Sequence, residues 1–174
     1  MRRVLLGHVP ELSLGFLLTF GSSIGQTFFI SLFAGEIRND LDLTHGMFGT
    51  FYSVATLMSA ITFLWIGKLT DKFNPIQIGV TTLIALSGFA MLMASTETVL
   101  ILFFSFFGLR LFGQSLLGHI AITAMSRWFS KERGQALSIA SLGHALGEAI
   151  LPIIIVFFLT MFNWREIWVV VSLS

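Results

Sequence analysis

Long stretches without a charged side chain are the strongest constraint on how this chain folds. Although the sequence holds ten basic and nine acidic residues, three runs contain none, namely residues 12–35, 43–67 and 73–96. Two later stretches, 98–126 and 134–164, are each interrupted by one charge, Arg110 and Glu148. A helix of about 20 apolar residues crosses the hydrocarbon core of a bilayer. Each stretch is therefore predicted to be a membrane-spanning helix.

The overall composition agrees with a membrane protein and excludes several other classes. Hydrophobic residues make up 55% of the chain and charged residues only 11%, against roughly a quarter in soluble domains. The net charge of +1 provides no basic surface for nucleic acid. The absence of cysteine excludes disulfides, thiolate metal sites and a cysteine nucleophile. No nucleotide-binding loop occurs, so neither ATP-driven transport by this chain nor a bound cofactor is expected.

The charges and helix breakers predict an all-α membrane bundle with five complete transmembrane helices and the start of a sixth. Pro75 is expected in the first turn of the third helix, where proline is tolerated. Pro152 is expected to kink the fifth helix without ending it. The predicted spans are residues 12–34, 46–67, 76–95, 98–125, 134–161 and 165–174, and the last of these is incomplete.

The basic residues between the spans predict the orientation of the bundle. Of the ten basic residues, two lie in segments on one side of the membrane, seven lie in segments on the other side, and Arg110 falls inside a span. Because loops rich in Lys and Arg stay in the cytoplasm, the N-terminus is predicted to be cytoplasmic. Tryptophans favour membrane interfaces, so Trp65 and Trp128 are expected at the cytoplasmic interface and Trp164 and Trp168 at the outer one. The seven basic residues are Arg2, Arg3, Lys68, Lys72, Arg127, Lys131 and Arg133.

The loop between the second and third spans carries a characteristic motif. It reads Gly67-Lys-Leu-Thr-Asp71-Lys72. This resembles the signature of the major facilitator superfamily, in which a glycine is followed four residues later by an aspartate and then by a basic residue. The signature normally continues with a glycine and further basic residues, whereas this chain continues with Asn-Pro-Ile.

Further segments resemble the same superfamily, in the order in which its members carry them. The fourth span contains Arg110-Leu-Phe-Gly113, which is similar to the fourth-helix motif except that its glycine comes one residue early. The other matches are the loop 127–134, the fifth-helix residues Gly143, Gly147 and Pro152, and the start of helix six at residues 163–165.

The resemblance implies the N-terminal six-helix half of a twelve-helix transporter in the inner or plasma membrane. Such a half consists of two inverted three-helix repeats and works with a C-terminal half, so this chain is expected to be a fragment. The implied function is secondary transport of a small solute by alternating access, without enzymatic activity. In the superfamily the aspartate of the loop motif steadies one access state. The gating residues implied here are Gly67, Asp71 and Lys72, with Arg127 as the partner of Asp71.

Arg110 is the first candidate for contact with the solute. A cation inside a bilayer costs about 2.5 to 3.5 kcal/mol on insertion scales, so it is expected to face a cavity or a partner. On a regular helix Gln114 shares its face, and a cation beside an amide favours an anionic solute such as a small carboxylate. Two alternatives remain open. Arg110 forms a buried ion pair with Glu148, or it extends toward the outer interface.

Glu148 and His144 form the second candidate group, because they lie one turn apart on the same face of the fifth span. An isolated carboxylate in a low dielectric favours its protonated form, which lets it exchange a proton near neutral pH. Pairing with Arg110 favours the ionised form instead. Glu148 is therefore a candidate for proton coupling, modulated by His144, and an interhelical hydrogen bond that only fixes packing is the alternative.

Polar side chains on the first two spans complete the set of candidates. Polar groups in lipid must face protein or water. Ser22 and Gln26 on the first span, and Tyr52 on the second, are therefore expected to contact either the solute or neighbouring helices.

Two other functional classes compete with transport. One is a non-transporting membrane protein, acting as an assembly partner or a half-sized homodimer. Six further spans with a second Gly-x-x-x-Asp loop downstream would favour the transporter instead. The other is an intramembrane enzyme, for which Ser141 and His144 form the sole candidate pair. His119 is expected to be structural, and no metal is expected, because nothing requires His119, His144 and Glu148 to converge.

Overall fold

The computed structural model describes residues 7–174 and contains no strand among them. Arg2 and Arg3, which contribute to the predicted orientation, lie outside the described residues. Two elements, η1 and η2, are 3₁₀ helices, and η3 is a π-helix. The elements are α2 (Val9–Ser22), η1 (Ser23–Gly25), α3 (Thr27–Ser31), α4 (Ala34–Asp40), α5 (His45–Ile66), η2 (Gly67–Asp71), α6 (Pro75–Ala94), α7 (Val99–Gly108), η3 (Leu109–Leu117), α8 (Gly118–Trp128), α9 (Arg133–Leu159) and α10 (Trp164–Leu173).

Five helical stretches of the described chain are long and apolar enough to cross a membrane. Each overlaps one predicted span, so the prediction of an all-α protein with five long apolar helices is confirmed. α10 begins at Trp164 and has ten residues. At 1.5 Å per residue it covers about half of the hydrocarbon core. The five stretches are Val9–Ser31, His45–Asp71, Pro75–Ala94, Val99–Trp128 and Arg133–Leu159.

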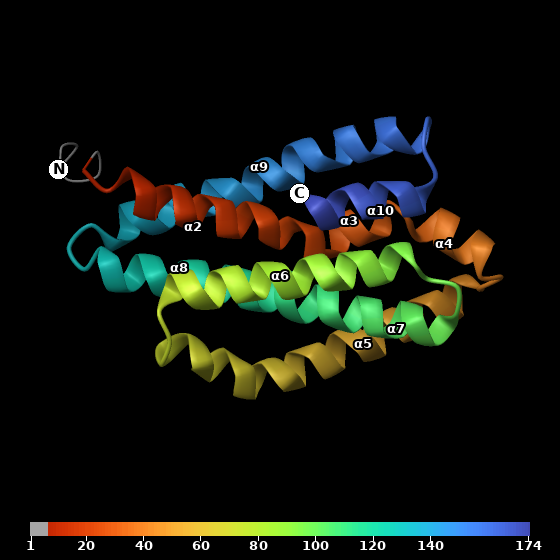
Figure 1. Ribbon diagram of the computed structural model, residues 1–174, viewed down its shortest axis with the longest axis horizontal. Helices are drawn as coiled ribbons and strands as arrows, with labels where there is room; N and C mark the ends of the chain where they lie inside the picture. Colours follow the sequence, from red (N-terminus) through yellow and green to blue (C-terminus); the bar gives the residue numbers. More distant parts are fainter. Residues whose placement is uncertain (1–6) are drawn as a thin grey trace.

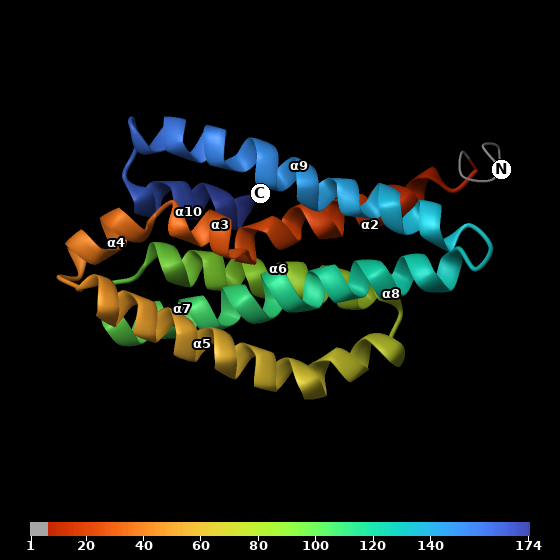
Figure 2. The same cartoon turned by 180° about the vertical axis from the view of Figure 1, so that it is seen from behind.

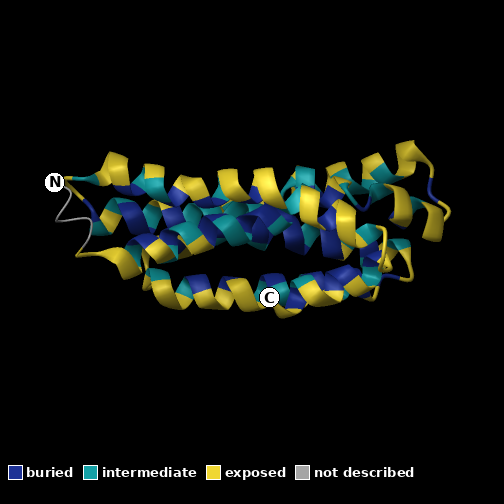
Figure 3. Ribbon diagram, turned by 90° about the horizontal axis from the view of Figure 1, so that it is seen from above, coloured by how far each residue is buried: buried dark blue, intermediate teal, exposed yellow. Residues whose placement is uncertain are grey.

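The long helices lie side by side along one axis of the molecule (Figure 1). α5 and α9 form the two edges of the bundle in both views, with α2, α6 and α8 between them (Figure 2). α2 packs chiefly on α9 and α8, and α6 packs on α10. Buried residues gather where helices face one another, and the outer surfaces are exposed (Figure 3). Because α5 and α9 are edge helices, most of their residues are not covered by this chain.

Side-chain caps define where several helices begin. Thr44 accepts a hydrogen bond from the backbone nitrogen of Met47 at the start of α5, and Asn74 accepts one from Ile76 at the start of α6. Pro75 occupies the first turn of α6, as predicted, where its missing N–H is not needed. α9 continues as one helix through Pro152, which confirms that this proline does not end the span.

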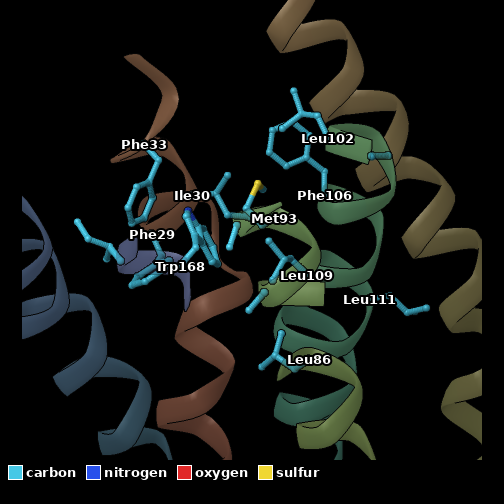
Figure 4. Packing of buried hydrophobic residues seen from close by; sticks show 14 of the residues in the cluster. Phe29, Ile30, Phe33, Leu86, Met93, Leu102, Phe106, Leu109, Leu111 and Trp168 are labelled. Atoms are coloured by element: carbon cyan, nitrogen blue, oxygen red, sulfur yellow. The ribbon is translucent and has the colours of Figure 1, made fainter. Parts of the chain in front are cut away.

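Aromatic side chains join the first span to α10 in the core (Figure 4). The Trp168 ring meets Phe29 edge-on, with 5.5 Å between centroids, and lies 5.0 Å from the ring of Phe33. All three side chains are fully buried. Trp168 is therefore a core residue, because the period of α10 turns its side chain toward α3. The expectation that it lies at the depth of the outer membrane interface stays a prediction.

A polar cluster ties together three segments at the α4 end of the bundle. One carboxylate oxygen of Asp40 accepts hydrogen bonds from the indole of Trp164, at 2.8 Å, and from Arg165. The other terminal nitrogen of Arg165 donates to the carbonyl oxygen of Thr96, at 2.7 Å. The bond from Trp164, followed by that from Arg165, lowers the pKa of Asp40. The cluster is therefore intact above the usual titration range of aspartate and weakens only as the pH falls through that lowered pKa.

Candidate functional site

The guanidinium of Arg110 lies inside the fourth long stretch and bonds to the first. Its side chain belongs to the π-helix η3, and the residue is only 6% exposed. Nη1 donates to the carbonyl oxygen of Gly25 and to Oγ1 of Thr27, each at 3.2 Å. The ring of Tyr52 on α5 lies over the guanidinium, with 5.4 Å from Cζ to the ring centroid. Three separate helices therefore contribute to the surroundings of this cation.

The charge of Arg110 has no acidic partner in the described part of the chain. The salt bridges found there involve other residues, and Glu148 pairs with His144 instead. Of the two alternatives considered for Arg110, the ion pair with Glu148 is not formed. Its Nε is buried and has no hydrogen-bond partner among the described residues. A buried cation without a counter-ion is costly.

A break in the first span produces the backbone acceptor for Arg110. The 3₁₀ turn η1 ends at Gly25, and Gln26 then adopts an extended conformation, with φ −79° and ψ 154°. The helix restarts at Thr27. The carbonyl oxygen of Gly25 would otherwise continue the helical ladder, and here it accepts from Arg110. Discontinuous helices of this kind place free backbone groups at the middle of transporter bundles.

Two glycines let the broken span and the π-helix touch. A Cβ atom built on Gly25 would overlap the backbone of Leu109, Gly113 and Gln114. A Cβ atom on Gly113 would lie 2.7 Å from the Cα of Gly25. The backbones of the first and fourth spans are therefore in direct contact at this level, which brings Arg110 within reach of Gly25.

Thr27 is the site residue that sequence reasoning missed. Its Oγ1 accepts from Arg110 and also from the hydroxyl of Tyr52, at 2.9 Å. Tyr52 was predicted as a candidate, and the structure places it beside Arg110. Nothing in the hydropathy of the first span distinguishes Thr27 from its other hydroxyl residues. Gly25, two residues before Thr27, was the one available indication in the sequence that the helix breaks at this point.

The other polar candidates of these spans occupy different positions. Gln114 is half-buried, and its Oε1 has no partner among the described residues. Gln26 is half-buried at the break itself. Ser22 is buried, and its hydroxyl donates to the carbonyl of Thr19 in its own helix, at 2.6 Å. Gln26 lies between Gly25 and Thr27, which both contact Arg110, and Gln114 follows Gly113, which contacts Gly25. The Ser22 hydroxyl, in contrast, is already hydrogen-bonded within its own helix.

His144 and Glu148 lie together on α9, as their spacing predicted. The distance between Nε2 of His144 and Oε2 of Glu148 is 4.0 Å, and the Glu148 side chain is 62% exposed in this chain. The His144 ring packs edge-on against Phe28, with 6.2 Å between centroids. Because Phe28 follows Thr27 directly, this pair adjoins the C-terminal half of the broken span. α9 approaches the first span closely because Gly143 and Gly147 lack side chains.

His119 packs against a neighbouring helix. Its ring meets Phe63 of α5 edge-on, with 5.3 Å between centroids. Within residues 7–174 no group of three metal-ligating side chains comes together.

The loop motif forms the predicted contact at the other end of the bundle. The Arg127 guanidinium donates to the carbonyl oxygen of Asp71, at 2.8 Å, and to its Oδ1, at 3.3 Å. Gly67 is buried, and a Cβ atom there would lie 3.1 Å from the Phe63 ring. Lys72 is exposed in the turn that follows. The pairing of Asp71 with Arg127 is thus confirmed, and it joins the α5 to α6 connection to the end of α8.

Comparison with known proteins gives one family. The family model of the Major Facilitator Superfamily matches residues 15–174. Neither the curated proteins nor the solved structures include a match.

Proposed function

Since this chain belongs to the Major Facilitator Superfamily, a family of membrane transporters, we propose that it forms one half of a secondary transporter that moves a small organic anion by alternating access. It is a multi-pass membrane protein with five apolar helices of spanning length. The observation that carries the proposal is the buried Arg110, which has backbone, hydroxyl and aromatic neighbours but no carboxylate partner among the described residues.

A second six-helix half belongs to this proposal. The exposed faces of the edge helices α5 and α9 support it, because a wide apolar surface on a bundle favours another helical unit or lipid. α10 would then begin the sixth helix, and the three-helix units before and after the α6 to α7 loop would be the inverted repeats. The N-terminus is cytoplasmic in this proposal, because Lys68, Lys72 and Arg127 cluster at the Asp71 end of the bundle.

The proposal is tested with the full-length protein in proteoliposomes. Small monocarboxylates and dicarboxylates are offered at equal concentration beside a neutral sugar and an organic cation. We expect uptake of at least one carboxylate, inhibited by other carboxylates and unaffected by the sugar or the cation. Uptake restricted to neutral or cationic solutes would overturn the assignment of Arg110 to the solute.

Glu148 is proposed to carry the coupling proton, with His144 beside it. Its position next to the C-terminal half of the broken span supports this role. We expect Glu148→Gln to retain solute exchange but to lose the stimulation of uptake by a proton gradient, because the amide cannot be ionised. Counterflow and gradient-driven uptake measure the two activities separately. Glu97→Gln, in the α6 to α7 loop, is the matched control, and gradient dependence that survives in Glu148→Gln would remove the coupling role.

Asp71 and Arg127 are proposed to steady one access state. The Asp71 side chain is 71% exposed, and exposed ion pairs contribute about 1 kcal/mol or less. We therefore expect Asp71→Asn to reduce uptake by only about two- to fivefold. Arg127 keeps its bond to the Asp71 carbonyl, which moderates the loss. Asp42→Asn is the control, since Asn also tolerates the positive φ of that residue, and equal uptake by both variants would argue against the gate.

A further inference from the structure

Arg110 is enclosed by its own chain, which raises the question of how a solute reaches it. Gly25 and Thr27 occupy one terminal nitrogen, and the Tyr52 ring lies over the guanidinium plane. With 6% of the residue exposed, Nε buried and Nη1 already bonded, an anion cannot be held by two guanidinium nitrogens unless one of these neighbours moves. The Gly25 backbone is wedged against Gly113 and Leu109, so it is the least able to do so.

Tyr52 is the neighbour that a small motion can displace. It is half-buried on the edge helix α5, and its ring meets Phe106 edge-on at 5.3 Å on the side of α7. Among residues 7–174, its hydroxyl forms one hydrogen bond, which it donates to Oγ1 of Thr27. Rotation about the side-chain torsions of Tyr52 therefore breaks this hydrogen bond and the contact of the ring with the guanidinium, and it uncovers the cation.

We propose that Tyr52 is a lid over Arg110, latched to Thr27, and that an anion is held by two nitrogens of Arg110 only when the Tyr52 to Thr27 hydrogen bond opens. This inference rests on the proposed function in taking the ligand to be an anion. Tyr52 and Thr27 are positioning residues here, because they control the exposure of Arg110. If the anion binds only the open state, its apparent affinity is reduced in proportion to the fraction of molecules that are open. A weaker latch increases that fraction and therefore raises the apparent affinity.

The lid itself is tested without transport, by chemical modification of Arg110. Full-length protein in membrane vesicles is treated with phenylglyoxal, which reacts with accessible arginines, and peptide mass spectrometry follows Arg110. A single neutral hydrogen bond changes an equilibrium by about two- to tenfold. We expect Tyr52→Phe and Thr27→Val each to accelerate modification of Arg110 by this factor, because both remove the latch.

Controls separate the latch from general loosening of the bundle. Thr50→Val is matched to Thr27→Val, since the Thr50 hydroxyl donates to the Gly46 carbonyl within α5, and it is expected to leave the rate unchanged. Thr27→Ser keeps the acceptor and should react at the original rate. In every sample the modification rate of Arg127 serves as the internal control for the activity of the reagent and for the folding of the protein. Equal modification of Arg110 in Tyr52→Phe and the unaltered protein would overturn the lid.

Anion uptake then tests the consequence for binding. Tyr52→Phe retains the ring over Arg110, and we expect its KM for the transported carboxylate to fall by about two- to tenfold. A rise in KM would overturn the proposal, because the hydroxyl would then be binding the solute directly. If no carboxylate is transported, the proposed function fails while the labelling rates still decide on the lid. If uptake depends on Arg110 but labelling is unchanged, the lid alone is wrong.

Discussion

Arg110→Gln is expected to reduce anion uptake by the full-length transporter about a hundredfold or more. A carboxylate held by two charge-assisted hydrogen bonds gains about 1.5 to 3 kcal/mol from each. Glutamine removes the positive charge and can donate through its amide only. Uptake of radiolabelled carboxylate in proteoliposomes measures the loss, with the amount of folded transporter determined by size-exclusion chromatography.

The lysine variant makes the same prediction more specific. Arg110→Lys keeps the charge but loses the planar pair of donors, so we expect a loss of about tenfold, smaller than that of glutamine. Arg133→Gln, an exposed arginine at the start of α9, is the control for removal of a positive charge. Uptake at the original level in both Arg110 variants would show that the guanidinium serves packing alone.

Gly25→Ala is expected to destabilise the folded bundle strongly. The added Cβ would overlap backbone atoms of Leu109, Gly113 and Gln114, which cannot rotate away as a side chain can. Overpacking costs about 1 to 3 kcal/mol where neighbours relax, and we expect the upper end of this range or more at a backbone crossing. A cost of about 3 kcal/mol corresponds to a fall in Tm of about 6 to 12 °C. Thermal unfolding and the yield of monodisperse protein in detergent measure the effect.

Gly21 provides a matched control one turn earlier on the same span. A Cβ atom there would meet only the side chains of Leu83 and Leu117, at 3.5 and 3.6 Å. These are ordinary van der Waals distances, so Gly21→Ala should fold with a Tm close to the original. If Gly25→Ala matched Gly21→Ala in yield and Tm, the two spans would not cross as closely as described.

Charge and hydropathy predicted the long helices because crossing a bilayer requires continuous apolar sequence. The predicted span 46–67 corresponds to α5 and the first residue of η2. The predicted span 76–95 differs by one residue at each end from α6, which covers Pro75–Ala94. The break after Gly25 and the π-helix were not predictable in this way. Hydropathy averages over a window, whereas both features depend on which backbone groups find partners outside their own helix.

The charged site residues were predictable, and their neutral neighbours were not. Arg110 and Asp71 stand out because charges are costly or restricted in membrane proteins. Thr27 does not, since a hydroxyl in an apolar span can bond to its own helix, as Ser22 does. The packing of Trp168 in an aromatic core was not predictable, because an indole is equally suited to a membrane interface and to such a core.

The π-helix η3 would allow the fourth span to lose one residue and remain helical. Its hydrogen bonds enclose one more residue than those of an α-helix, so deletion of one residue between Leu109 and Leu117 would let a regular ladder close. Side chains within η3, Arg110 among them, would then point in new directions relative to α8. Arg110 would leave the Gly25 carbonyl although no site residue had been replaced. Among relatives of this chain, a one-residue gap at this point would therefore mark a change in what the cation faces.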